Sequence, residues 1–142
     1  MPSESTARRI LSALENNAKA SVKELAEEVG VSKPTVRKYV QELEEEGVIV
    51  GYSADVDPKK LSDQSIALVG MDVESERYVE ATRSLKRLDS VHSLYTASGD
   101  HSLMAEVRAK DGDALGDVIE ENILAINGIT AAHPAILNER LK

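Results

Sequence analysis

The sequence contains no Cys, no Phe and no Trp, and only four of its 142 residues are Tyr. Without cysteine the chain forms no disulfide and offers no thiolate as a metal ligand or a nucleophile. No apolar run approaches the roughly 18 residues that a membrane-spanning helix needs. The first residues also lack the charged and then apolar pattern of a secretory signal. We therefore expect a cytoplasmic protein, away from the membrane, with an aliphatic core.

Acidic residues outnumber basic ones by 25 to 17, which gives a formal net charge of -8 at pH 7. The acids are spread along the chain, so they predict a solvated surface and not an acidic tail. High acid content with few large aromatic residues also suits a salt-rich cytoplasm. One stretch differs from this pattern. The segment SKPTVRKYVQ, residues 32–41, carries Lys33, Arg37 and Lys38 and no acid.

The first 50 residues or so predict three helices. Helical spacing marks the first of them at Ala7, Ile10, Leu11 and Leu14. The second begins at a capping box made by Ser21 and Glu24, in which each side chain bonds the backbone amide of the other residue. Gly30 is placed to end it in the left-handed conformation. The apolar stripe between these two signals consists of Val22, Leu25, Ala26 and Val29.

The third helix is predicted to begin at Ser32 as its N-cap and to end at Gly47, with Pro34 in the first turn. Two helices joined by a tight turn that contains glycine are typical of the helix-turn-helix arrangement. The backbone amides in the first turn of the third helix have no helical partner, so this end of the helix suits a phosphate. The basic residues surround that end, while the acids lie in the last turns. Those acids are Glu42, Glu44, Glu45 and Glu46.

After the third helix, apolar residues alternate strictly with the other residues over positions 48–56. This pattern predicts a strand, or a hairpin that turns at Gly51. The polar segment 57–60 then reads as a linker. We expect a DNA-binding headpiece over residues 1–52, a hinge strand and linker over 53–63, and a second domain over 64–142.

The second domain predicts the element order β-α-β-β-α-β. The expected strands cover residues 66–73, 91–97, 103–108 and 129–137, the first of them buried on both faces. One helix is marked by apolar residues from Tyr78 to Leu88, and another begins at Asp111 or Asp113 and ends at Gly128. Residues 98–101 form a hairpin turn. The fold class is therefore α+β, an N-terminal helix-turn-helix followed by a ferredoxin-like βαββαβ sandwich.

The chain resembles the Lrp/AsnC family of leucine-responsive and asparagine-responsive transcription regulators. The resemblance rests on residues 10–61, where EEEGVIVGY is especially diagnostic, and on YTASGDHSLMAEVRAKD at residues 95–111. It implies a winged helix-turn-helix that binds DNA, a ferredoxin-like domain with an amino-acid effector, and dimers formed through the C-terminal sheets that can assemble further into tetramers or octamers. A two-fold dimer reads a pseudo-palindromic promoter site, with its recognition helices ~34 Å apart. The composition and family together indicate an archaeal and halophilic source.

By the same resemblance, eight residues face the DNA. Tyr39 stands where the family usually has Arg late in the recognition helix. The usual acidic start of the first helix is also missing. The DNA-facing positions are Ser21, Lys23, Ser32, Lys33, Thr35, Arg37, Lys38 and Tyr39.

The resemblance places the effector against the hairpin loop of the second domain. A second Asp typical of that loop is Ser102 here, and two Thr common on the last strand are replaced by Ala132 and Pro134. We expect no cofactor, and no metal site, because the three histidines (one of them His92) have no close ligand spacing. The expected effector residues are Ser98, Gly99, Asp100, His101, Ser102 and His133.

Two other functions remain open at this point. One is a metabolite-sensing or partner-pairing module that does not bind DNA by itself. The other is an enzyme similar to the siroheme decarboxylases, whose fold resembles that of the family. Such an enzyme needs several Arg and His residues around a tetrapyrrole, and the second domain has few candidates. We therefore expect a transcriptional regulator and not an enzyme.

Overall fold

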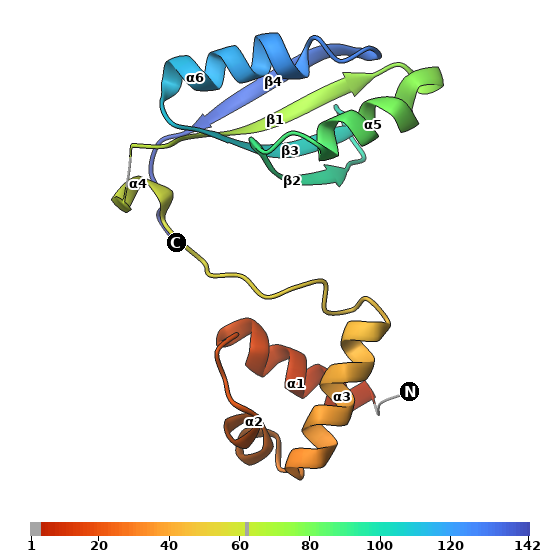
Figure 1. The fold of residues 1–142 in the computed structure, drawn as a ribbon, viewed down its shortest axis with the longest axis vertical. Coiled ribbons are helices and arrows are strands. Elements are labelled where there is room, and N and C mark those ends of the chain that lie inside the picture. Colours follow the sequence, from red (N-terminus) through yellow and green to blue (C-terminus); the bar gives the residue numbers. More distant parts are fainter. Residues whose placement is uncertain (1–3, 62) are drawn as a thin grey trace. The chain divides into compact units, whose positions relative to one another are not determined.

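The computed structural model describes residues 4–61 and 63–142 (Figure 1). The chain divides between Val56 and Asp57 into two compact units, each with its own core. This division lies inside the predicted hinge of residues 53–63. In the described ranges no helix is long and apolar enough to cross a membrane.

The N-terminal unit contains the three predicted helices, α1 (Glu4–Asn16), α2 (Val22–Val29) and α3 (Lys33–Glu45). Their apolar faces meet in a small aliphatic core, because each helix repeats apolar residues at intervals of three and four. The buried members are Ala13, Leu25, Ala26 and Val36, packed against Leu14, Ala20, Val22, Val31 and Val40.

The predicted beginning and end of α2, and the predicted beginning of α3, are confirmed. The Ser21 hydroxyl accepts from the Glu24 amide and the Glu24 carboxylate accepts from the Ser21 amide, both at 3.1 Å. Gly30 has φ 79° and its amide donates to the Ala26 carbonyl at 2.9 Å. Gly30 and Val31 separate α2 from Ser32, which begins α3 as its N-cap.

The predicted strand over residues 48–56 is wrong. The structure has no strand there, although the Val48 and Ile49 amides both donate to the Leu43 carbonyl. A strand needs a neighbour to accept its backbone hydrogen bonds. The N-terminal unit offers none within its described residues, and Val50 is 95% exposed. Alternation of apolar residues alone does not produce a strand.

The C-terminal unit has the predicted β-α-β-β-α-β order and forms an antiparallel four-stranded sheet in the order β2-β3-β1-β4 (Figure 1). The outer strand β2 pairs with β3, which follows it in the chain, whereas the outer strand β4 pairs with β1 from the opposite end of the domain sequence. The strands are β1 (Ser65–Val73), β2 (Val91–Thr96), β3 (Leu103–Ala109) and β4 (Ile129–Leu137).

Both main helices of this unit pack on one face of the sheet. Alternate residues of β1 and β3 point to that face and form one core with α5 (Tyr78–Lys86) and α6 (Gly112–Asp117). The opposite face of β1 is only partly buried, since Leu68 is 41% exposed. The expectation that β1 is buried on both faces is therefore wrong. The sheet is covered by helices on one face only.

The connections differ in detail from the predicted ones. A 3-10 turn, η1 (Ser75–Arg77), precedes α5. Asp111 is the N-cap of α6, its carboxylate accepting from the Ala114 amide at 2.8 Å, and the helix continues as a π-helical segment, η2 (Val118–Ile123). The predicted linker 57–60 falls partly in a short helix, α4 (Pro58–Leu61). In its neighbourhood the Lys59 ammonium donates to the Asn138 carbonyl at 2.7 Å.

Candidate DNA-binding helix and histidine cluster

Helix α3 has a buried face and an exposed basic face. Val36 and Leu43 lie in the core, while Lys33, Arg37 and Lys38 are exposed. Residues four apart on a helix are neighbours on its surface, so Lys33 and Arg37 lie one above the other. In the part of the chain that the structure describes, none of the three basic side chains forms an ion pair within 4.0 Å. These cations remain available to an external anion.

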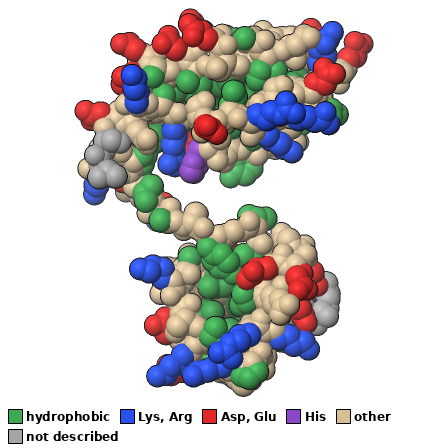
Figure 2. Space-filling model, in the orientation of Figure 1, with side chains coloured by type: hydrophobic (Ala, Val, Ile, Leu, Met, Phe, Trp, Pro, Cys, Tyr) green, Lys and Arg blue, Asp and Glu red, His purple; other side chains and the backbone are tan. Residues whose placement is uncertain are grey.

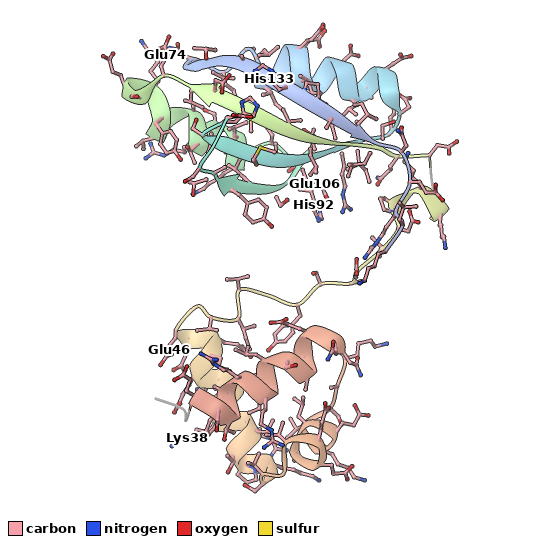
Figure 3. The ribbon with its side chains drawn as sticks, turned by 180° about the vertical axis from the view of Figure 1, so that it is seen from behind. Lys38, Glu46, Glu74, His92, Glu106 and His133 are labelled. Atoms are coloured by element: carbon pink, nitrogen blue, oxygen red, sulfur yellow. The ribbon has the colours of Figure 1, made fainter. Side chains whose placement is uncertain are left out.

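The charge along α3 changes sign from its beginning to its end. The first turn contains no acid, and Lys and Arg side chains gather at the lower end of the N-terminal unit in Figure 2. Figure 3 labels Lys38 and, past the other end of the helix, Glu46. The partial positive charge of a helix N-terminus adds to these cations. An anion is therefore attracted to the beginning of α3 and repelled from its end.

Serine hydroxyl groups cap the N-termini of α2 and α3. The Ser32 hydroxyl accepts from the Thr35 amide at 3.3 Å and lies 2.8 Å from the Thr35 hydroxyl. The Ser21 hydroxyl is held by the capping box, with the exposed Lys23 beside it. Tyr39 is partly buried and is less accessible than its basic neighbours. Six of the eight expected DNA-facing residues are therefore exposed on α2 and α3 or at their N-caps, while Thr35 and Tyr39 are partly buried.

The expected effector residues fall into two groups. Ser98, Gly99 and Asp100 are exposed in the loop between β2 and β3, where Gly99 has φ 129°. The Ser102 hydroxyl donates to the Met71 carbonyl at 3.4 Å, which ties the end of the loop to β1. The two histidines form the second group.

His101 and His133 come together around a residue that the sequence did not indicate, Asp72. The imidazole rings stack with their centroids 4.5 Å apart. His101 Nδ1 lies 2.9 Å from Asp72 Oδ1, and His133 Nε2 lies 3.2 Å from Asp72 Oδ2. The hydrogen bond from His101 holds the pKa of the Asp72 carboxyl below its usual value, against partial desolvation, and the hydrogen bond from His133 adds to the shift. Asp72 is therefore a carboxylate that faces two imidazoles.

His92 stands apart from this cluster. It lies on β2, as expected, with its Nε2 3.8 Å from a carboxylate oxygen of Glu106. Figure 3 labels this pair and, elsewhere on the sheet, His133.

Comparison with known proteins identifies both units. Residues 4–50 match the model of the winged helix-turn-helix DNA-binding family, and residues 66–142 match that of the Lrp/AsnC ligand binding domain. The chain is 70% identical, over the full length of both proteins, to the HTH-type transcriptional regulator LrpA1 of Halobacterium salinarum. The chain belongs to the Lrp/AsnC family. It is a DNA-binding transcriptional regulator of the Lrp/AsnC type.

Other similar proteins support the same family assignment. The chain is 42% identical to the HTH-type transcriptional regulator LrpA of Pyrococcus abyssi over 94% of each chain. It resembles the solved structure of Escherichia coli AsnC with a TM-score of 0.78 and 30% identity, over 100% of this chain and 96% of that one. The expected α+β fold class is confirmed, and the relative from Halobacterium supports the expected archaeal and halophilic source. These relatives are named as regulators and not as enzymes.

Within the Lrp/AsnC ligand binding domain, sequence reasoning missed Asp72 and Gly70. Both lie on the side of β1 that faces away from the helices, in the series Ile66, Leu68, Gly70 and Asp72 that alternates with the core residues. The alternation could have indicated Asp72, because it is the last residue of the series on the side of β1 that no helix covers. Its pairing with His133 depends on the register of β1 with β4, which joins Gly70 to His133.

Proposed function

We propose that the regulator binds promoter DNA by placing α3 in the major groove. Lys33, Arg37 and Lys38 carry this proposal, because they form an exposed basic surface at the N-terminal half of one helix and have no acidic partner in the described chain. A helix fits the width of the major groove, and arginine reads guanine there through two hydrogen bonds. We assign that role to Arg37, near the middle of the exposed row.

The remaining DNA-facing residues position the helix. Ser21 and Lys23, at the beginning of α2, and Ser32 and Lys33, at the beginning of α3, are assigned to phosphates. Hydroxyl and ammonium groups at helix N-termini suit that task. Thr35, Lys38 and Tyr39 complete the surface. These contacts supply affinity without base specificity.

A homodimer would bind two half-sites. Two-fold symmetry repeats the recognition helix, so the operator is expected to be pseudo-palindromic with half-sites one turn, ~34 Å, apart. The resemblance to the family supports the dimer and its further assembly into tetramers or octamers.

Fluorescence anisotropy with labelled DNA tests the proposal. The duplex is the region upstream of the protein's own gene, and a duplex of scrambled sequence measures non-specific binding. We expect saturable, salt-sensitive binding that Arg37→Ala weakens by about 1–3 kcal/mol, most strongly on the specific duplex. Arg83→Ala is the matched control, because it removes an exposed arginine from α5 of the other unit.

The same titrations distinguish the alternatives. Lys33→Ala is expected to weaken binding to both duplexes about equally and to reduce the slope of log affinity against log salt by about one. If the folded wild-type protein binds neither duplex at any salt concentration, the sensing or partner-pairing module becomes the better description. Equal losses in Arg37→Ala and Arg83→Ala would show that only net charge matters.

We further propose that an amino acid is the effector and binds at the loop between β2 and β3. Gly99 permits close approach of a ligand to the backbone, and the exposed Asp100 is placed to pair with an ammonium group. Ser98, Ser102, His101 and His133 complete the expected surface. The family's ligand binding domain, matched over residues 66–142, supports this role.

Calorimetric titration with each of the common amino acids tests the effector site. Asp100→Asn is expected to abolish binding of the responsive amino acid, because the variant keeps the shape and loses the charge. Asp89→Asn changes another exposed carboxylate of the same unit and should leave binding intact. Loss of binding in both variants, or in neither, would contradict the assignment of Asp100.

A further inference from the structure

We propose that Asp72, His101 and His133 form a binding site for a divalent transition metal ion of the Zn²⁺ class. The three residues offer one ligand atom each, and these atoms all lie within 4.8 Å of one another. They come from three separate segments: β1, the loop before β3, and β4. The site is argued from these side chains alone and does not depend on the proposed amino-acid effector.

The distances suit a metal ion. Bonds of about 2.0–2.1 Å in a tetrahedron place neighbouring ligand atoms about 3.3 Å apart. The Asp72 carboxylate oxygens already lie 2.9 Å from His101 Nδ1 and 3.2 Å from His133 Nε2. An ion would replace the protons that these atoms now share. The His133 side chain is 54% exposed, so little packing opposes a small ring movement that draws its nitrogen toward an ion.

The ligand types select the ion. Two imidazoles and one carboxylate suit zinc and its neighbours in the first transition series, whereas Mg²⁺ and Ca²⁺ prefer oxygen ligands. Three protein ligands leave at least one coordination position open, as in zinc sites that bind water or a small molecule. The α-amino and carboxylate groups of an amino acid together form a chelating pair that can fill such positions. This ligand set therefore predicts an ion that remains accessible to a small ligand.

The fold supports the site with two local features. The pairing of β1 with β4 shifts register between Asp72 and Val73, a bulge of the kind that redirects a side chain. Gly70 leaves room for His101, since a Cβ there would lie 2.3 Å from His101 Cδ2. Asp72 and the two imidazoles thus share one end of the sheet face that the helices leave bare.

Zn²⁺ titration of the full-length, tag-free, chelator-treated protein tests the proposal by calorimetry, with no amino acid or DNA present. We expect saturable binding of Zn²⁺ and none of Mg²⁺ at the same concentration. His133→Ala and Asp72→Asn should each weaken Zn²⁺ binding at least about tenfold, because each removes a ligand. His92→Ala is the matched control, a histidine on the same sheet with no place in the cluster. Its affinity should equal that of the wild type.

Co²⁺ supplies a spectroscopic measurement of the same site. Visible absorption bands are expected on Co²⁺ binding to the wild type and to His92→Ala, and they should be lost in His133→Ala. Circular dichroism verifies that each variant is folded. Because the His133 side chain is 54% exposed, its replacement by alanine should leave the fold intact. Absence of Zn²⁺ binding at millimolar concentration would overturn the proposal. Equal weakening by His92→Ala and His133→Ala would overturn it too, because it would show non-specific binding to surface histidines.

Discussion

The imidazole ring of His101 rests directly on the backbone of Gly70, where a Cβ would lie 2.3 Å from the ring atom Cδ2 and 2.8 Å from Cγ. Gly70 is not among the residues with positive φ, so its conformation is open to any residue. Glycine is therefore required at this position for space. The contact fixes the height of His101 above the sheet and, through the stacked ring, the position of His133.

Replacement of this glycine tests the contact. Gly70→Ala is expected to lower the free energy of unfolding of the C-terminal unit by about 1–3 kcal/mol, because the imidazole must move or the strand must bend. Gly116→Ala serves as the control, since residue 116 is exposed in α6 and has nothing within 4 Å of its Cβ position. Chemical denaturation followed by amide NMR signals of each unit gives both values.

The control should change stability in the opposite direction. Alanine stabilises a helix by roughly 0.5–1 kcal/mol relative to glycine, so Gly116→Ala should make the unit more stable. Equal free energies of unfolding for Gly70→Ala and the wild type would mean that His101 can move away from β1 without loss of stability. That result would contradict a tight contact between His101 and Gly70.

The buried face of α5 provides a second prediction. Leu85 is fully buried in the core of the C-terminal unit, whereas Val79, on the same helix, is 66% exposed. Leu85→Ala should lower the free energy of unfolding by about 2–5 kcal/mol, because it leaves a cavity in a close-packed core. Val79→Ala should change it by less than about 0.5 kcal/mol. Similar losses in the two variants would contradict the packing of α5 on the sheet.

Local patterns predicted the local structure well. The capping box of Ser21 and Glu24 and the left-handed Gly30 involve residues close in sequence, and such short-range signals specify a helix boundary by themselves. The order of strands and helices in the C-terminal unit followed equally from apolar spacing. The family resemblance correctly predicted a DNA-binding first unit and a second unit of the ligand binding domain family.

The failures have a common cause in long-range pairing. The strand expected over residues 48–56 lacks a neighbouring strand, and alternation of apolar residues says nothing about whether a neighbour exists. Asp72 and His133 are 61 positions apart and meet only through the register of β1 with β4. The spacing of the histidines along the chain therefore could not predict the cluster of Asp72, His101 and His133, which forms only when the sheet pairs its strands.

The capping box leads to a third prediction. Ser21→Ala removes the acceptor of the Glu24 amide, so it should destabilise the N-terminal unit by about 1 kcal/mol. Ser12→Ala is the matched control, because Ser12 is exposed in the interior of α1, where alanine is at least as favourable. Amide hydrogen exchange in α2 gives a direct measurement, with faster exchange expected only in Ser21→Ala. Unchanged exchange in that variant would show that the box does not stabilise the helix.

Tyr52 gives a prediction at alkaline pH. Partial burial raises the pKa of its phenol above the usual value of 10.0, and the hydroxyl also donates to a Glu44 carboxylate oxygen at 3.0 Å, whose negative charge disfavours a phenolate. A raised pKa means that the folded state holds the proton more tightly than the unfolded state. The resulting stability is fully present below pH 10 and is lost as the pH rises through the pKa of Tyr52 in the folded state.

Absorbance at the tyrosinate band measures this titration. The wild type should show a tyrosine that titrates above pH 10, and this component should be absent from Tyr52→Phe. Glu44→Gln keeps the size of the side chain and removes its charge, so it should shift that titration to lower pH. An unchanged titration in Glu44→Gln would show that the carboxylate does not act on Tyr52.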